Sequence, residues 1–260
     1  MSFADAKQRF SNRVADYVRY RPGYPAALLD LLRGECGLQP GSVIADVGSG
    51  TGLLAELFLR NGNRVFGIEP NPEMRAGGEE YLRAHANFTS VDGSAEATTL
   101  AGTSVNFITA GQSFHWFEPQ AARREFLRIL KPGGWVVIVW NDRRMEEAPL
   151  TREYEGLLER FGIDYKRVKD AYPETTIIRN FFEGSFAEHD LPNHQTLGWA
   201  GFRGRLRSSS FVPTEDHPNF APMMAELERI FRIYQRGSCV RMEYFTRAFF
   251  GQLHSAGSGI

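Results

Sequence analysis

The segment that most restricts the fold of this chain is VIADVGSGTGLLAELFL, which spans Val43–Leu59. An apolar, β-branched run leads into three alternate glycines, and an apolar run with helical spacing follows directly. Glycine lets the backbone turn sharply and lets a ligand approach without a Cβ in the way. A plain turn between a strand and a helix does not need three alternate glycines. We therefore expect a nucleotide-type loop at the carboxyl end of a strand, where α/β proteins bind ligands.

Glu69 ends the next predicted strand, in the stretch RVFGIEPNPEM, and lies 19 residues after Gly50. An acidic residue at this place can accept hydrogen bonds from both ribose hydroxyls of a nucleoside. Dinucleotide-binding proteins share this pairing, but their GxGxxG pattern requires a glycine where this chain has Leu53. In addition, Glu56 near the start of the helix would repel a pyrophosphate. A nucleoside cofactor without phosphates therefore fits better, and a dinucleotide-dependent oxidoreductase is disfavoured.

Short β-branched runs alternate with longer helical patterns from Gly41 to Asn141, which is typical of a parallel sheet covered by helices on both faces. The motif LKPGG at Leu130–Gly134 should end a helix, because Pro132 cannot continue it and glycine permits the left-handed turn into the next strand. The expected strands are Ser42–Val47, Arg64–Glu69, Phe88–Val91, Val105–Ala110 and Trp135–Trp140, and the expected helices are Gly52–Asn61, Pro72–Ala84 and Gln120–Leu130.

After Asn141 the pattern is less regular. Leu150–Phe161 and Met223–Gln235 have helical spacing and predict a cap over the site, while Phe186–Thr196 and Val240–Phe250 are candidates for the last two strands. With 260 residues the chain can bury one sizeable core, so we predict one α/β domain. Its expected parts are an N-terminal lid with the first helices (1–40), a cofactor-binding core (41–141), the cap with late sheet elements (142–235), and a final strand with a tail (236–260).

The 30 basic and 31 acidic residues nearly cancel, so no overall field attracts the chain to nucleic acid or to an anionic membrane. We expect neither partner, and the sequence carries no signal for an oligomeric state. Cys36 and Cys239 lie in no metal-binding pattern, so we predict reduced cysteines and no metal site. No apolar run approaches the ~20 residues that span a bilayer, and the charged, proline-broken N-terminal segment is not typical of a signal peptide. We therefore expect a cytoplasmic protein.

Five stretches together resemble the successive motifs of class I S-adenosylmethionine-dependent methyltransferases: DVGSGTG, GIEPNPEM, VDGSAE, AGQSFHWF and LKPGGWVVIVWN. The resemblance covers Phe10–Asn141. Within that superfamily, FSNRVADYVRYRPGYP and AGQSFHWF are most similar to the small-molecule branch, methyltransferase type 11, which includes trans-aconitate methyltransferase-like enzymes. The resemblance implies a Rossmann-like fold with a mostly parallel seven-stranded sheet, helices on both faces and a helical cap.

The resemblance also implies S-adenosyl-L-methionine as the cofactor, with S-adenosyl-L-homocysteine as its product. The glycine loop would approach the methionine part, with Asp46 orienting the loop, and Glu69 would hold the ribose. Pro70 and Asn71 would border the adenine, and either Asp92 or Glu96 would accept from its exocyclic amine. The expected cofactor-binding residues are Asp46, Gly48, Ser49, Gly50, Gly52, Glu69, Pro70, Asn71, Asp92, Ala95, Glu96 and Gln112.

Methyl transfer from a sulfonium is an in-line displacement with a neutral leaving group, so the protein mainly aligns the acceptor and excludes water. An obligatory base is not required, and His115 is the best candidate for one, the alternative being a structural histidine. Arg203, Arg205 and Arg207 stand next to three serines, a combination that suits a carboxylate but also a solvated basic face. The expected substrate residues are Tyr17, Tyr20, Arg21, His115, Trp116, Trp140 and Arg207.

The leading hypothesis is an enzyme that methylates an oxygen, nitrogen or carbon of a small molecule, with carboxylic acids among the candidate acceptors. A second hypothesis, from another class, is a protein that binds S-adenosylmethionine without catalysis and acts as a sensor or partner-interaction module. The complete glycine loop and Glu69 favour the enzyme.

Overall fold

A seven-stranded sheet forms the centre of the molecule, with strand order β3-β2-β1-β4-β5-β7-β6. The computed structural model describes residues 18–146, 148–170 and 175–254. Neighbouring strands from β3 through β5 pair in parallel, whereas β7 runs antiparallel to both β5 and β6. The strands are β1 (Val43–Val47), β2 (Arg64–Ile68), β3 (Phe88–Val91), β4 (Val105–Gly111), β5 (Leu130–Arg143), β6 (Ala187–Gly198) and β7 (Cys239–Gly251).

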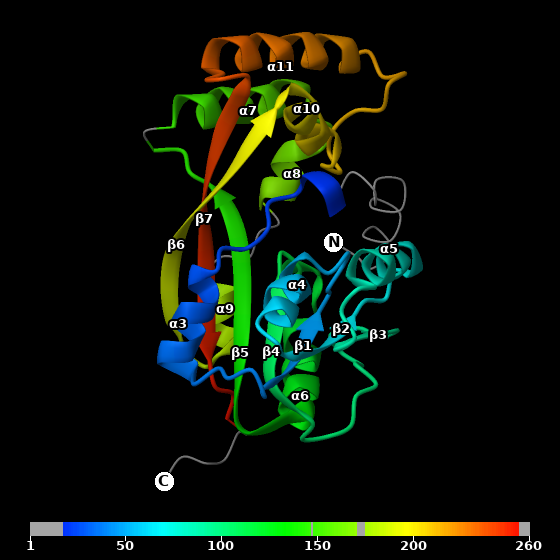
Figure 1. Ribbon diagram of the computed structural model, residues 1–260, viewed down its shortest axis with the longest axis vertical. Helices are drawn as coiled ribbons and strands as arrows, with labels where there is room; N and C mark the ends of the chain where they lie inside the picture. The colour runs from blue at the N-terminus through cyan, green and yellow to red at the C-terminus, as the bar shows by residue number, and fades with distance from the viewer. Residues whose placement is uncertain (1–17, 147, 171–174, 255–260) are drawn as a thin grey trace.

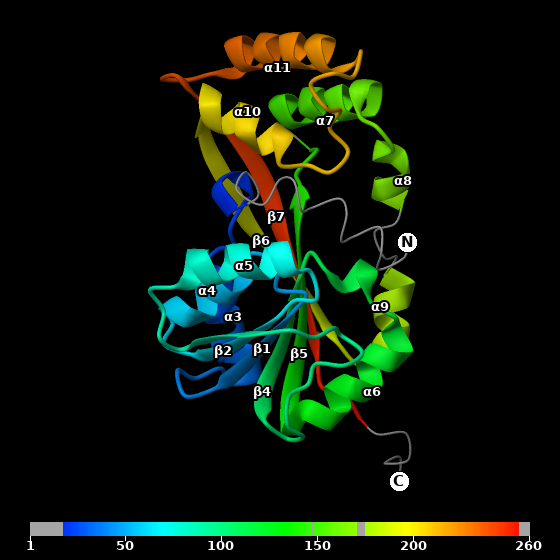
Figure 2. The ribbon, with the colours of Figure 1, turned by 90° about the vertical axis from the view of Figure 1, so that its right-hand side faces the viewer.

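Helices cover both faces of this sheet (Figure 2). On one face lie α3 (Ala27–Cys36), α4 (Leu53–Arg60) and α5 (Pro72–Leu82), and on the other lie α6 (Pro119–Ile129) and α9 (Thr175–Phe181). Strand alternation explains the two layers, because Ile44 packs with the α3 and α4 side chains while its neighbour Ala45 packs with those of α6 and α9. Fully buried phenylalanines such as Phe58 and Phe126 each contribute roughly 1.5–3 kcal/mol of hydrophobic stabilisation.

A second hydrophobic layer lies beyond the carboxyl ends of the parallel strands (Figure 1). It is built from α7 (Pro149–Phe161), α8 (Tyr165–Asp170), α10 (Trp199–Arg207) and α11 (Phe220–Tyr234). Their buried side chains, among them Tyr154, Phe202 and Leu227, pack with the ends of β6 and β7. These four helices form the cap, and the long strands β5, β6 and β7 connect it to the core.

The segment before α3 connects the core to the cap. The Gly23 carbonyl accepts hydrogen bonds from the side-chain amides of Asn141 at 3.1 Å and Asn193 at 2.9 Å. Arg21 Nη2 donates to the Ser208 carbonyl, which caps α10, at 2.9 Å. Residues from β5, β6 and α10 thus hold the 20–24 segment in place, and those contacts join positions more than a hundred residues apart.

The expected strands and helices are confirmed, with bounds that differ by a few residues at most ends. The largest difference is β5, which extends beyond the expected Trp135–Trp140 because β7 pairs with it as far as Arg143. Gly133 takes the left-handed conformation predicted for the LKPGG turn, with φ of 74°, and the β4–β5 register shifts beside it. Among the described residues, no helix is long and apolar enough to cross a membrane, and no cluster of potential metal ligands occurs.

Candidate active site

The glycine loop between β1 and α4 takes a conformation that requires glycine. Gly48, Gly50 and Gly52 have φ values of 65°, 56° and 84°, a left-handed region in which side chains are strained. The Ser49 amide donates to the Ile68 carbonyl at 3.0 Å, which holds the loop against the end of β2. The three alternate glycines therefore shape a tight loop at the carboxyl edge of the sheet.

Two of these glycines also allow close packing. A Cβ on Gly48 would lie 2.6 Å from Ser113 Cβ, so the loop after β4 can approach only a glycine here. A Cβ on Gly52 would lie 2.4 Å from Leu82 Cδ1 on α5. Gly52 does not line the cavity described next, and in this structure it provides space for helix packing.

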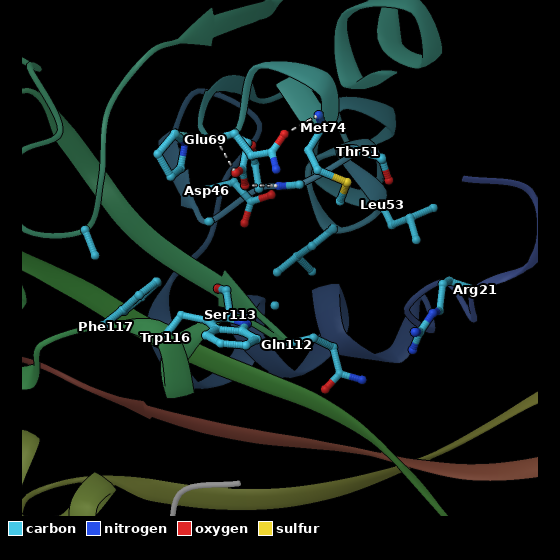
Figure 3. Close-up of a pocket in the computed structure, with 18 of the residues that line it drawn as sticks. Arg21, Asp46, Thr51, Leu53, Glu69, Met74, Gln112, Ser113, Trp116 and Phe117 are labelled. Carbon is cyan, nitrogen blue, oxygen red and sulfur yellow. Dashed lines mark hydrogen bonds between the residues drawn. The ribbon is translucent and has the colours of Figure 1, made fainter. Parts of the chain in front are cut away.

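A cavity that is partly open to solvent lies above this loop (Figure 3). Asp46, Glu69 and Met74 lie on one side of it, while Ser113, Trp116 and Gln112 lie on the other, and Arg21 stands at one end. The lining residues are Arg21, Pro22, Tyr24, Asp46, Gly48, Ser49, Gly50, Thr51, Leu53, Leu54, Glu69, Pro70, Asn71, Met74, Ala95, Gly111, Gln112, Ser113, Trp116 and Phe117.

The Glu69 carboxylate is held at the cavity wall by backbone amides. One oxygen accepts from the Gly50 amide at 2.9 Å and the other from the Asn71 amide at 2.8 Å. Burial raises the pKa of Glu69 above its usual value, although these two hydrogen bonds and the charge of Arg75 oppose the increase. Asn71 in turn caps α5 through its side-chain oxygen, with Pro72 at the first helical position.

Asp46 is the most buried acidic group of the site, with 1% of its surface exposed. Thr109 Oγ1 donates to its Oδ1 at 2.8 Å, whereas its Oδ2 has no hydrogen-bond partner among the described residues. Burial raises the pKa of Asp46 to about 7, with the Thr109 hydrogen bond opposing this effect and the charge of Glu69 adding to it.

Three buried polar atoms that line the cavity thus have no partner within the described part of the chain: Asp46 Oδ2, Thr51 Oγ1 and Gln112 Oε1. Buried polar atoms in native proteins are nearly always hydrogen-bonded, so these point to a polar ligand. The accepting oxygens of Asp46 and Glu69 fit a nucleoside with a positively charged or hydroxylated part.

Most of the expected cofactor residues line this cavity, but Asp92 and Glu96 do not. The Asp92 side chain is 73% exposed and forms an ion pair with Arg75 at 3.1 Å. Glu96 Oε1 accepts from the Glu118 amide at the start of α6, at 2.9 Å. Both carboxylates are therefore engaged outside the cavity, and Ala95 is the residue of this stretch that reaches it.

Sequence reasoning missed several cavity residues, including Leu54 and Met74, whose helical spacing indicates only a buried face. Thr51, inside the glycine motif, was recognised as part of the loop but not as a lining residue. The sequence could have indicated Gly111, because a glycine at a strand end can mark a close approach of another residue. A Cβ added to Gly111 would lie 2.5 Å from the Tyr24 hydroxyl.

A second cavity lies between the core and the cap and shares only Arg21 and Gln112 with the first. Its other walls come from the carboxyl end of β5, from β7 and from cap helices. Trp140, Arg143, Glu155, Tyr165, Arg205 and Arg247 are among its lining residues. Arg143 forms an ion pair with Glu155 at 2.8 Å and also donates to the Tyr165 hydroxyl at 2.6 Å.

The expected substrate residues do not all lie at one site. Arg21 and Trp116 line the first cavity, and Arg21 and Trp140 line the second. His115 lines neither, and burial lowers its pKa to about 4, so the geometry does not support a role as base.

Two further expected substrate residues lie away from both cavities, and a third lies outside the described residues. Tyr20 packs against α10, where a Cβ on Gly204 would lie 2.3 Å from its ring. Arg207 lines neither cavity and forms an ion pair with Glu215 at 2.9 Å, whereas Arg205 of the same helix reaches the second cavity. Tyr17 lies outside the described residues.

Known proteins that are similar to this chain are methyltransferases. The profile of a methyltransferase domain matches residues 45–138, from β1 into β5. Uncharacterized methyltransferases of Mycobacterium bovis and Mycobacterium tuberculosis are 33% identical over 181 residues, which cover 69% of this chain and 71% of theirs. An uncharacterized methyltransferase-like protein of Schizosaccharomyces pombe is 33% identical over 60% of this chain and 59% of its own.

A solved structure of a protein assigned as a type II methyltransferase from Anaeromyxobacter dehalogenans has the same fold, with a TM-score of 0.63 and 22% identity. The match covers 90% of this chain and all of that one. Because the mycobacterial relatives are 33% identical over more than two thirds of both chains, this chain belongs to the methyltransferase family, and the Anaeromyxobacter structure shows that it shares their fold class.

Proposed function

We propose that this protein transfers a methyl group from S-adenosylmethionine to a small-molecule acceptor. The observation that carries the proposal is the pair of adjoining cavities that share Arg21 and Gln112. One cavity has the glycine loop and the acidic residues suited to a nucleoside, and the other lies under the cap. Two substrates bound in adjoining cavities can meet at the shared residues, which is the arrangement that an in-line group transfer needs.

The first cavity suits the cofactor through a small set of polar groups. Glu69 would accept from the ribose hydroxyls, since each carboxylate oxygen that already receives one amide hydrogen bond can accept another. Asp46 Oδ2 and Thr51 Oγ1 supply unfilled hydrogen-bonding positions in the wall. When bound, the cofactor would supply an electrophilic methyl group on a sulfonium. The Gly48–Gly50 loop would lie against it.

The acceptor is proposed to be a small molecule, and a carboxylic acid suits the arginines of the second cavity. The cap, the 20–24 segment and the end of the sheet supply walls of that cavity, which is partly open to solvent. No protein base is assigned, because a sulfonium has a neutral leaving group and His115 lines neither cavity. Alignment of the two substrates at Arg21 and Gln112 is then the main contribution of the chain.

The proposal is tested first by calorimetric titration with S-adenosylmethionine, S-adenosylhomocysteine, NAD and NADP. We expect the first two to bind and the dinucleotides not to bind. A screen over small carboxylic acids and other metabolites then measures release of S-adenosylhomocysteine. Failure to bind either sulfur nucleoside would refute the proposal. Tight binding without turnover of any acceptor in a broad screen would favour a non-catalytic binding protein instead.

A further inference from the structure

Arg205 is a buried cation without an acidic partner. It lies on α10 with 3% of its surface exposed and lines the second cavity. Its hydrogen bonds go to neutral groups, from Nε to the Tyr244 hydroxyl at 3.4 Å and from Nη1 to Ser209 Oγ at 3.2 Å. Within residues 18–146, 148–170 and 175–254, no carboxylate lies within ion-pair distance of it. A buried charge in this state is costly unless something else compensates it.

The other arginines of β5 and β7 that line this cavity are compensated. Arg143 pairs with Glu155 at 2.8 Å, and Arg247 pairs with Asp190 at 3.2 Å as well as with Glu188. Arg205 is therefore the one of these three arginines that no carboxylate of the described residues contacts. An anionic group on a ligand can compensate it, and a carboxylate matches the planar guanidinium in geometry.

Two polar atoms of the same cavity are also unused. Trp140 Nε1 is a buried donor, and Gln112 Oε1 is a buried acceptor, and neither has a hydrogen-bond partner in the described part of the chain. Trp140 is 4% exposed, so bulk water does not easily satisfy its N–H group. A ligand with one anionic group and one further polar group would pair with Arg205, Trp140 and Gln112 together.

These positions separate the charged end of the ligand from the reacting end. Arg205 and Trp140 line the second cavity alone, whereas Gln112 and Arg21 line both. We infer that the acceptor is a small carboxylate whose charged group binds Arg205 and whose methyl-accepting atom belongs to a different group, located beside Gln112. A lone pair of that atom forms the bond to the methyl carbon, the carbon–sulfur bond breaks with its electrons left on sulfur, and the proton of the accepting group passes to solvent, to which the cavity is partly open. This inference rests on the proposed methyl transfer and makes it more specific, because the carboxylate anchors the acceptor and is not itself methylated.

Arg205 also affects the stability of the free protein and of its carboxylate complex in different ways. An uncompensated buried guanidinium does not stabilise the free protein, so its replacement by an apolar side chain of similar length should not lower the melting temperature. A bound carboxylate, in contrast, stabilises the native state in proportion to its affinity and raises the melting temperature. If Arg205 instead stabilised the free protein, its replacement by an apolar side chain would lower the melting temperature, and carboxylates would not raise the melting temperature of the wild type.

The experiment measures thermal unfolding and calorimetric binding of the full chain loaded with S-adenosylhomocysteine. The probes are sodium propionate, butyrate and hexanoate, with the corresponding neutral amides and inorganic phosphate for comparison. The variants are Arg205→Met, Arg205→Lys and the matched control Arg203→Met, which removes an exposed arginine from the same helix. S-adenosylhomocysteine affinity of every variant is measured in parallel.

We expect carboxylates, but not amides, to raise the melting temperature of the wild type and of Arg203→Met. Arg205→Met should bind carboxylates at least tenfold more weakly, keep its S-adenosylhomocysteine affinity and keep its melting temperature. Arg205→Lys should retain part of the carboxylate response, so a result is available even if the methionine variant does not fold. Methylated product from the acceptor screen should still carry its negative charge.

Several results would overturn the inference. Equal carboxylate responses of Arg205→Met and the control would remove Arg205 from the site, and a stronger response to phosphate than to carboxylates would assign it another ligand. Competition between carboxylates and S-adenosylhomocysteine would mean that Arg205 serves the cofactor's own carboxylate. A neutral methyl ester as the product would also contradict it. If the wild type does not bind S-adenosylhomocysteine at all, the proposed function fails and this inference fails with it.

Discussion

Glu69 accepts a hydrogen bond from the backbone amide of Gly50 at 2.9 Å, which joins the end of β2 to the glycine loop after β1. The second carboxylate oxygen accepts from the Asn71 amide, so both oxygens are oriented by the backbone. Because Glu69 lines the first cavity in this orientation, the acceptor for a ribose is positioned by the fold rather than by the ligand.

Replacement of Glu69 by Ala should weaken S-adenosylhomocysteine binding by more than tenfold, because the ribose hydroxyls lose a charged acceptor worth about 1.5–3 kcal/mol. Calorimetric titration measures the change. The control is Glu73→Ala, which removes an exposed carboxylate from the start of α5 outside the cavity and should leave the affinity unchanged. Unchanged affinity in Glu69→Ala would refute the ribose assignment.

Gly48→Ala should destabilise the protein and weaken cofactor binding together. The new Cβ would lie 2.6 Å from Ser113 Cβ on a backbone with φ of 65°, and such strain costs on the order of 1–3 kcal/mol. The control is Gly34→Ala within α3, where no heavy atom lies within 4 Å and the helix should gain roughly 0.5–1 kcal/mol. Urea unfolding distinguishes the two, and equal effects would contradict the packing described for the loop.

The raised pKa of Asp46 predicts a specific pH dependence of the free energy of unfolding. Its pKa is raised from an ordinary value of 3.8 to about 7, so between these pH values the folded state binds more protons than the unfolded state. The free energy of unfolding therefore falls as the pH rises through this window, by about 1.4 kcal/mol for each unit of pKa difference. Asp46→Asn should lack this decrease, so its stability relative to the wild type should rise between about pH 4 and pH 7 in urea unfolding. A stability difference that is constant with pH would show that Asp46 does not titrate there.

His115→Gln should leave turnover within about threefold of the wild type and leave its pH profile unchanged above about pH 5, because the imidazole is already neutral there. The comparison is Trp116→Leu, which alters a neighbouring residue that does line the first cavity and should weaken S-adenosylhomocysteine binding. Turnover is measured with the acceptor found in the screen. A loss of more than tenfold in His115→Gln with intact cofactor affinity and stability would restore the histidine as a candidate base.

The sequence by itself determined the features that depend on local conformation. Three alternate glycines predict a left-handed loop because few other residues adopt positive φ, and Gly48, Gly50 and Gly52 do so. Alternating β-branched and helical runs predict the order of the elements, since apolar periodicity reflects which face is buried. The spacing from the loop to Glu69 likewise follows from one strand–helix–strand unit.

The tertiary structure alone decided which polar groups face the cavities. Gly52 faces Leu82, Asp92 pairs with Arg75, and Glu96 binds the start of α6, although all three lie in motifs that suggest ligand contact. Among the arginines of α10, packing of the cap buries Arg205 and leaves Arg207 to pair with Glu215. The orientation of these side chains depends on residues far apart in the chain, as when Arg21 donates a hydrogen bond to the Ser208 carbonyl. Long-range contacts of this kind carry no periodic signal in the sequence, because their free energy comes from neighbours that only the folded chain brings together.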